Sequence, residues 1–144
     1  MFIRYKGKTK LMHLPIAASV AVLEGSVVAF ASGTIIPATN TTAAYDCVGV
    51  CRKTIASTDD DYAVAKFIPV EVPVEMNVEW LTDVKVGTLA TSSVGLYFDL
   101  TTADDGSGVD QSASTYDIAQ CTKFITTAKG LFVLNIGAQA IAKA

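Results

Sequence analysis

The chain has 144 residues, of which 51% are hydrophobic and only 17% charged, and its formal net charge is −3. This length is typical of one domain and is sufficient for a core that needs no disulfide or metal. No uninterrupted run of 18 apolar residues occurs, which excludes a transmembrane helix. Valine, alanine, isoleucine and threonine dominate, so strands are favoured over helices. The low charge favours a subunit of an assembly over a solitary enzyme.

The first ten residues carry four basic residues and no acidic one: Arg4, Lys6, Lys8 and Lys10. The rest of the chain holds seven basic and fourteen acidic residues. A basic segment on an acidic body can dock on a partner. The same residues can instead form a solvated first strand, with Phe2 and the basic residues on one face and Ile3 and Tyr5 on the other. Residues 1–13 are therefore predicted to be a basic arm or a first strand. Nucleic-acid binding is not expected, because four charges give a small footprint on phosphate.

This end of the chain also imitates a secretory signal peptide. Basic residues precede the apolar run Leu11–Leu23, and Ala29-Phe30-Ala31 has the pattern of a cleavage site. Pro15 and Glu24-Gly25 are unfavourable in such a peptide. Secretion is therefore an alternative, and synthesis in the cytoplasm is the expectation.

Short β-branched and apolar runs, separated by turn signals, predict a succession of strands. Glu24-Gly25 and Ser32-Gly33 mark tight turns of hairpins. Tyr62–Phe67 is either a hairpin partner of the strand that follows it or the beginning of that strand. The other predicted strands are Leu14–Val22, Ser26–Ala31, Thr34–Ala38, Tyr45–Thr54, Val94–Leu100, Tyr116–Thr126 and Leu131–Ile136, with a short segment at Val84–Leu89 and polar loops at Thr39–Ala44, Ser57–Asp61 and Thr101–Thr115.

The strongest pattern is Ile68–Trp80, in which every even-numbered residue is apolar. Period two over this length predicts one long, half-buried strand. Pro69 and Pro73 remove backbone donors from one edge, which is therefore expected to face solvent or an irregular neighbour. The odd positions also hold three glutamates, Glu71, Glu75 and Glu79. These are expected to form a solvated face that opposes sheet-to-sheet association.

The order of elements predicts one all-β domain over residues 14–137, a small barrel or a sandwich. An alanine-rich tail follows at 138–144, and no long amphipathic helix is expected. The three cysteines, Cys47, Cys51 and Cys121, do not form a disulfide framework. Cys47 and Cys51 are roughly 13 Å apart if they share a strand, which is too far for a bridge. Buried, reduced thiols are expected.

No segment matches a catalytic or cofactor-binding motif. His13 is the only histidine, and no nucleophile motif accompanies it, so a structural role is expected. The glutamates of the long strand are roughly 13 Å apart, beyond the separation of a glycosidase pair. Asp59–Asp61, and Asp104-Asp105 with Asp110, lack calcium-loop spacing and are expected to be hydrophilic loops. No enzyme activity, metal or cofactor is therefore expected. Four aromatic residues are candidates for a sugar-binding face, although core and interface positions are favoured: Trp80, Tyr97, Phe98 and Tyr116.

Several runs recur in a characteristic order along the chain: Val20–Phe30 with Gly33 and Ile35–Ala38, Val48-Gly49-Val50, Pro69–Val74, Val86-Gly87-Thr88, Val94–Leu100, Ile118–Cys121 and Gly130–Leu134. This order, over Leu14–Gly137, resembles the small decoration, or cement, proteins of tailed-phage capsids. The resemblance implies a small β-barrel or β-tulip domain with an extended N-terminal arm. It also implies a structural virion protein that binds the outside of the expanded capsid, often as a trimer, and bridges major capsid subunits.

The basic segment lies outside the shared pattern, and its role is a separate hypothesis. Its predicted capsid contacts are Phe2, Arg4, Tyr5, Lys6, Lys8 and Lys10. The expected partners are the major capsid protein and further copies of this chain, with no nucleic acid and no membrane. The alternatives are another virion β-module, such as a head-fibre base, a tail component or a sugar-binding surface protein, or a secreted carbohydrate-binding β-domain.

Overall fold

The computed structural model describes residues 1–39, 42, 46–101 and 107–136. The prediction of an all-β fold is confirmed. In chain order the elements are β1 (Ile3–Lys6), β2 (Thr9–Ile16), β3 (Val27–Ala31), β4 (Thr34–Pro37), β5 (Cys47–Cys51), β6 (Lys66–Pro73), β7 (Glu79–Val86), the 3₁₀ helix η2 (Thr91–Ser93), β8 (Tyr97–Leu100), β9 (Val109–Asp110), β10 (Ala119–Thr126) and β11 (Lys129–Leu134). Within the described ranges, no helix has the length and apolar character needed to cross a membrane.

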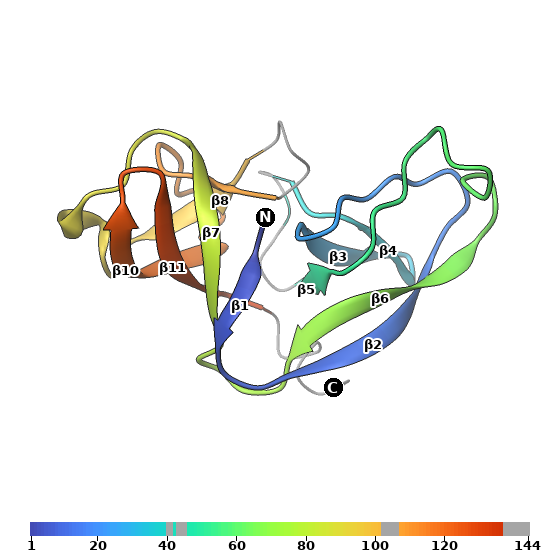
Figure 1. Cartoon of the computed structure of the whole chain (residues 1–144), viewed down its shortest axis with the longest axis horizontal. Helices are drawn as coiled ribbons and strands as arrows, with labels where there is room; N and C mark the ends of the chain where they lie inside the picture. Colours follow the sequence, from blue (N-terminus) through green and yellow to red (C-terminus); the bar gives the residue numbers. More distant parts are fainter. Residues whose placement is uncertain (40–41, 43–45, 102–106, 137–144) are drawn as a thin grey trace.

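The strands form two closed sheets. One is a barrel in the order β2-β4-β3-β5-β6. The other has the order β1-β7-β11-β10-β8-β9, and β9 also pairs with β7, which closes this sheet on itself. Strand β1 pairs with the beginning of β7, at Glu79–Leu81, and β9 pairs nearer its end, at Val84 and Val86. Figure 1 shows the two sheets as two lobes, with β1 between them.

The prediction of one long strand over Ile68–Trp80 is wrong. Strand β6 ends at Pro73, and β7 begins at Glu79 in the other sheet. The ladder of β6 with β2 reaches its limit at the pair Thr9–Pro73. The alternation of apolar and polar residues continues through the connection between β6 and β7. Its apolar residues Val74 and Met76 are nevertheless exposed, at 36% and 71%.

Two connections cross between the sheets side by side. Gly7 and Lys8 join β1 to β2, and the backbone N–H of Val74 donates to the Lys8 carbonyl at 3.1 Å. The Lys8 N–H donates to the Glu75 carboxylate at 2.9 Å. Gly7 has φ +102°, and a Cβ there would lie 2.9 Å from the Cα of Val78. Only glycine satisfies both the backbone conformation and this close approach.

Other boundaries also differ from the prediction. The first long strand is displaced toward the N-terminus, because Thr9–Ile16 pairs with β6 whereas Val22 makes an isolated bridge to Ile55. Strand β9 lies inside the predicted loop at Thr101–Thr115. The predicted hairpin at Ser32-Gly33 is confirmed as β3–β4. The alanine-rich tail at 138–144 and Asp104-Asp105 lie outside the described residues.

Buried side chains from both sheets belong to one hydrophobic cluster. Its largest fully buried members include Trp80, Phe2 and Phe132, and Trp80 and Phe132 are cross-strand partners on β7 and β11. Phe2 immediately precedes β1, and its N–H donates at 2.7 Å to the carbonyl of Gly25, in the turn that leads into β3 of the other sheet. Burying such a side chain contributes roughly 1.5–3 kcal/mol. The N-terminal residues therefore follow the strand interpretation and help to join the two sheets.

Candidate functional site

The predicted contact residues at the N-terminus separate into buried and exposed groups. Phe2 is 0% exposed, whereas Tyr5 is 62% exposed. Lys6, Lys8 and Lys10 are all exposed. Strand β1 is also an edge strand, because among the described strands only β7 pairs with it. The exposed part of this segment thus combines lysines, an aromatic ring and an unpaired strand edge.

Arg4, unlike these lysines, forms an ion pair within the chain. Its Nε lies 3.1 Å from Oε2 of Glu71, whose side chain is only 13% exposed. The same oxygen accepts a 2.7 Å hydrogen bond from the Thr9 hydroxyl. The other carboxylate oxygen, Oε1, accepts from Nη2 and Nε of Arg52 at 2.6 and 2.8 Å. The expectation that Glu71 lies on a solvated face is therefore wrong, because two guanidinium groups and a hydroxyl surround its carboxylate.

Arg52 links this ion-pair network to the core. Its Nη1 donates to the Phe2 carbonyl at 3.2 Å, and its guanidinium carbon lies 5.8 Å from the ring centroid of Trp80. A guanidinium at this distance from an indole face is attracted by the ring. The network of Arg4, Thr9, Arg52 and Glu71 therefore connects β1, β2, β6 and the residue after β5. The sequence does not indicate this position of Arg52, because the strand register that brings it to Glu71 cannot be deduced from the order of residues.

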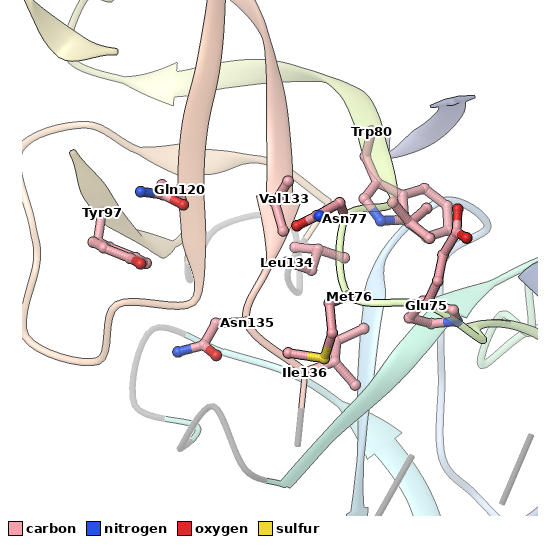
Figure 2. Close-up of a pocket in the computed structure, with 12 residues that line it drawn as sticks. Glu75, Met76, Asn77, Trp80, Tyr97, Gln120, Val133, Leu134, Asn135 and Ile136 are labelled. Carbon is pink, nitrogen blue, oxygen red and sulfur yellow. The ribbon is translucent and has the colours of Figure 1, made fainter. Parts of the chain in front are cut away.

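A pocket of about 190 Å³ lies beside Trp80 (Figure 2). The connection between β6 and β7 supplies Glu75 to Val78, and β8 and β10 supply Tyr97 and Gln120. The end of β11 and the residues after it supply Val133–Ile136. The crossing of the chain between the two sheets therefore forms one wall of this pocket.

The polar groups of this pocket are mostly uncharged. The Trp80 side chain is fully buried, and its Nε1–H has no hydrogen-bond partner among the residues that the structure describes. The Asn77 amide and the Tyr97 hydroxyl form no hydrogen bond with any described residue. Gln120 and Asn135 donate through their amide nitrogens to the carbonyls of Gly95 and Asp117, at 3.2 and 3.4 Å, which leaves their side-chain oxygens available.

Of the four aromatic candidates for a sugar-binding face, Trp80 and Phe98 belong to the core, as the sequence favoured, with exposures of 0% and 4%. Tyr97 and Tyr116 are 42% and 38% exposed, and Tyr97 lines the pocket together with the buried Trp80. No sequence pattern indicated the three amides of the pocket, Asn77, Gln120 and Asn135, because they come from separate segments and follow no common spacing.

The remaining candidates form no recognisable centre. His13 is exposed on β2, opposite Pro69. Asp61 pairs with Lys66 at 2.9 Å, and this hydrogen bond lowers the pKa of the Asp61 carboxyl. In the part of the chain that the structure describes, no three His, Cys, Asp or Glu side chains are grouped so that they could hold a metal ion.

The three cysteines are buried, and none forms a disulfide, as predicted. Burial raises the pKa of the Cys47 thiol to about 12, and the neighbouring Asp46 adds to this shift. Burial also raises the pKa of Cys51 and Cys121. Since the thiolate is the reactive form, these thiols are expected to be inert in the folded protein.

The raised pKa of Cys47 predicts a loss of stability in alkali. The unfolded chain ionises this thiol near its ordinary pKa of 9.0, whereas in the folded chain the thiol keeps its proton until about pH 12. The contribution is complete below about pH 9 and decreases above it, by about 1.4 kcal/mol per pH unit. We expect the unfolding free energy to fall less steeply above about pH 9 in Cys47→Ala than in the wild type, as urea unfolding would measure. Parallel curves would contradict the prediction.

No protein-family model, curated protein or solved structure matches this chain.

Proposed function

We propose that this chain is a structural virion protein that binds the outer surface of a tailed-phage capsid and stabilises the expanded shell. In this proposal it bridges major capsid subunits, docks as a homotrimer and has no catalytic role. The observation that carries the proposal is the exposed edge strand β1, which presents Ile3 and Tyr5 beside Lys6, Lys8 and Lys10.

The apolar part of this surface extends across three strands. Ile3 on β1 pairs with Leu81 on β7, and Leu81 pairs with Leu131 on β11. Ile3 is 50% exposed, whereas Leu131 is buried but lies outside the main core cluster. The exposed part of this row of apolar side chains is therefore Ile3 together with the half-buried Leu81, whereas Leu131 is already covered. Burial of such a row against a partner would add to affinity.

The basic part of the surface supports an acidic partner. Within the described ranges, no ion pair involves Lys6, Lys8 or Lys10, whereas Arg4 is already paired with Glu71. Exposed lysines of this kind steer association toward a negative surface, and their effect weakens with salt. A trimer would present three copies of this surface, and the second and third would bind at high effective concentration.

The free edge of β1 offers a second mode of contact. Its unpaired backbone groups can accept an extended segment of another chain. The ion-pair network and Phe2 hold this strand against both sheets, so its position is fixed before docking. A preorganised contact loses less conformational entropy on binding.

The test is co-sedimentation with expanded heads and with procapsids. We expect the wild type to sediment with expanded heads, and charge reversal of Lys6, Lys8 and Lys10 to glutamate to lower occupancy about tenfold at low salt. The control reverses two other exposed lysines that form no ion pair among the described residues, Lys53 and Lys123, and the loss of occupancy is compared per charge reversed. Light scattering would establish whether the protein in solution is a trimer.

Absence of the wild-type protein from expanded heads at every salt concentration would refute the proposed function. Equal occupancy of both reversed variants would refute the role of the N-terminal lysines. Arg4 is left unchanged in both variants, because its reversal would also disrupt the pair with Glu71.

A further inference from the structure

Strand β2 has one paired edge and one free edge. Its pairing with β6 extends from Thr9 to Ile16, whereas on the other side only Ile16 pairs, with Ile35 of β4. A single residue pair therefore closes the barrel at this point. In Figure 1, β2 lies along the border of its lobe, with β6 beside it. Within the described ranges, no strand pairs with the other edge of β2 before Ile16.

The prolines of β6 show which backbone groups of β2 point to the free edge. Pro69 lies opposite His13 and has no N–H, and its carbonyl accepts from the Arg52 N–H on the β5 side. His13 and Pro69 are therefore a pair without mutual hydrogen bonds, and such pairs alternate with hydrogen-bonded ones in an antiparallel ladder. The odd-numbered residues of β2 thus direct their N–H and C=O groups away from β6. The hydrogen bond from the Val74 N–H to the Lys8 carbonyl fits this alternation, because Lys8 is even-numbered.

Leu11 and His13 consequently present their N–H and C=O groups without a backbone partner among the described residues. Both side chains are exposed as well. Free donors and acceptors at the spacing of a strand are a template for one further strand. In recognition by strand addition, these main-chain groups supply affinity and the side chains along the edge supply specificity.

The outer face of the β2–β6 ribbon is mostly apolar. Its exposed large side chains are Leu11 and Phe67, at 55% and 67%, and between them His13 lies opposite Pro69. Side chains directly opposite each other in a ladder lie on the same face of the sheet. A strand added at the free edge would therefore place every second side chain beside Leu11 and His13. Apolar residues are expected at these positions of the added strand.

The alternate side chains of the added strand would meet lysines. Lys8 and Lys10 are exposed, occupy even-numbered positions and form no ion pair among the described residues. Of the nearby carboxylates, Glu71 is paired with two arginines, and Glu75 accepts from the Lys8 N–H. Four basic side chains thus accompany two carboxylates, and the local charge is positive. A second copy of β2 would add its own lysines, and like charges destabilise a strand pair. An acidic segment is favoured instead.

We propose that the free edge of β2 binds an extended segment of a partner protein in which acidic residues alternate with apolar ones. The segment adds one antiparallel strand beside Leu11–His13. Its apolar residues exchange backbone hydrogen bonds with Leu11 and His13, and its acidic residues lie beside Lys8 and Lys10. This contact shares two lysines with the surface proposed to dock on a capsid, and it rests on the proposed function only for the identity of the partner.

Amide hydrogen exchange of the full chain, read by NMR, tests both the free edge and its occupation. In the free protein, the amides of Leu11 and His13 are expected to exchange faster than those of Met12 and Leu14, which pair with β6. The probe is an acetylated heptapeptide in which glutamate and valine alternate. We expect it to slow exchange at Leu11 and His13 and to bind with a Kd of about 0.1–1 mM that rises with salt.

Three altered peptides separate charge from backbone pairing. A heptapeptide of alternating lysine and valine reverses the charge and is expected to bind at least about tenfold more weakly. N-methylation of the valines removes the donors that would face Leu11 and His13, and binding should be lost. N-methylation of the glutamates removes only donors on the opposite edge of the peptide, so binding should be retained.

Variants of the protein provide a second comparison. His13→Pro removes the edge N–H without removing a hydrogen bond to β6, and proline is tolerated at the solvent edge of a strand. His13→Ala is the matched control, because it loses the imidazole but keeps the N–H. Binding is expected to weaken about tenfold in His13→Pro and less than about twofold in His13→Ala. Lys10→Glu should abolish the preference for the acidic peptide, whereas Lys123→Glu, on β10, should leave it unchanged.

Three outcomes would overturn the proposal: no peptide protects Leu11 and His13, the acidic and basic peptides bind equally, or the two methylated peptides bind equally. Self-association that His13→Pro abolishes would show that a second copy occupies the edge and would overturn it as well. Sedimentation with expanded heads tests the proposed function separately. Peptide binding without sedimentation would refute only the capsid function, and sedimentation without peptide binding would refute only this contact.

Discussion

Replacing Glu71 by glutamine is expected to lower the free energy of unfolding by about 3 kcal/mol. The Glu71 carboxylate is 13% exposed and meets Arg52 at 2.6 Å and Arg4 at 3.1 Å. Glutamine keeps the shape of the side chain but removes its charge. Its NH₂ group would also replace an acceptor oxygen and face the N–H and O–H donors that now bind the carboxylate. The Arg52 side chain, which is 21% exposed, would then lose its countercharge in a mostly dry environment. Urea unfolding followed by the fluorescence of Trp80 would measure the change.

Glu79→Gln is the matched control for this substitution. Glu79 is the next-but-one glutamate along the same alternating stretch and is half-buried, but it belongs to no ion pair among the described residues. A change of less than about 0.5 kcal/mol is expected for it. Equal effects of the two substitutions would show that the network around Glu71 contributes no specific stability.

The two arginines are expected to contribute unequally. Arg52 donates twice to Glu71, donates to the Phe2 carbonyl and lies over Trp80, whereas Arg4 is 47% exposed. Surface ion pairs contribute about 0–1 kcal/mol, so Arg4→Ala is expected to have the smaller effect. A double-mutant cycle between Glu71→Gln and each arginine would measure the two coupling energies.

The sequence predicted the buried face of the chain better than its path. In the stretch Ile68–Trp80, the alternation correctly assigned Ile68, Val70, Val72, Val78 and Trp80 to the interior, with exposures of 0–2%. It did not reveal that the chain leaves one sheet and enters another between Pro73 and Glu79. Side-chain period reports which face is buried, but the end of a strand depends on where its partner ends, which here is Thr9.

The candidate site was predictable only in its aromatic part. Trp80 and Tyr97 were two of the four aromatic candidates, and the structure places both among the residues that line the pocket, with Trp80 buried. Asn77 and Asn135 are isolated amides with no shared spacing, and only the crossing of the chain between the two sheets brings them near each other. The partner of Glu71 was hidden for the same reason, because Arg52 reaches it through the register of β5 with β6.

Asp99 has the surroundings that would make a buried carboxylate a candidate for catalysis, since it is only 3% exposed. Its oxygens are nevertheless occupied by backbone donors. Oδ1 accepts from the N–H groups of Tyr116 and Asp117 at 2.7 and 2.9 Å, and Oδ2 accepts from Thr115 at 3.0 Å. Asp117 also has φ +52°, a conformation that needs support from its surroundings. The Asp99 carboxylate therefore holds the backbone of the loop before β10 in its conformation, and its function is structural.

Asp99→Asn is accordingly expected to destabilise the fold by about 3 kcal/mol, because hydrogen bonds to a charged acceptor contribute about 1.5–3 kcal/mol each and the new NH₂ group would face an N–H donor. Asp110→Asn is the control, because within the described ranges the Asp110 side chain accepts hydrogen bonds only from Ser112, in an exposed turn. A loss below about 1 kcal/mol is expected for it. Amide hydrogen exchange adds a local measurement. The amides of Thr115, Tyr116 and Asp117 should exchange faster in Asp99→Asn, whereas those of the distant β2–β6 ladder should follow only the change in global stability. Unchanged exchange at these three amides would mean that the loop holds its conformation without the carboxylate, and the case for a structural function of Asp99 would fail.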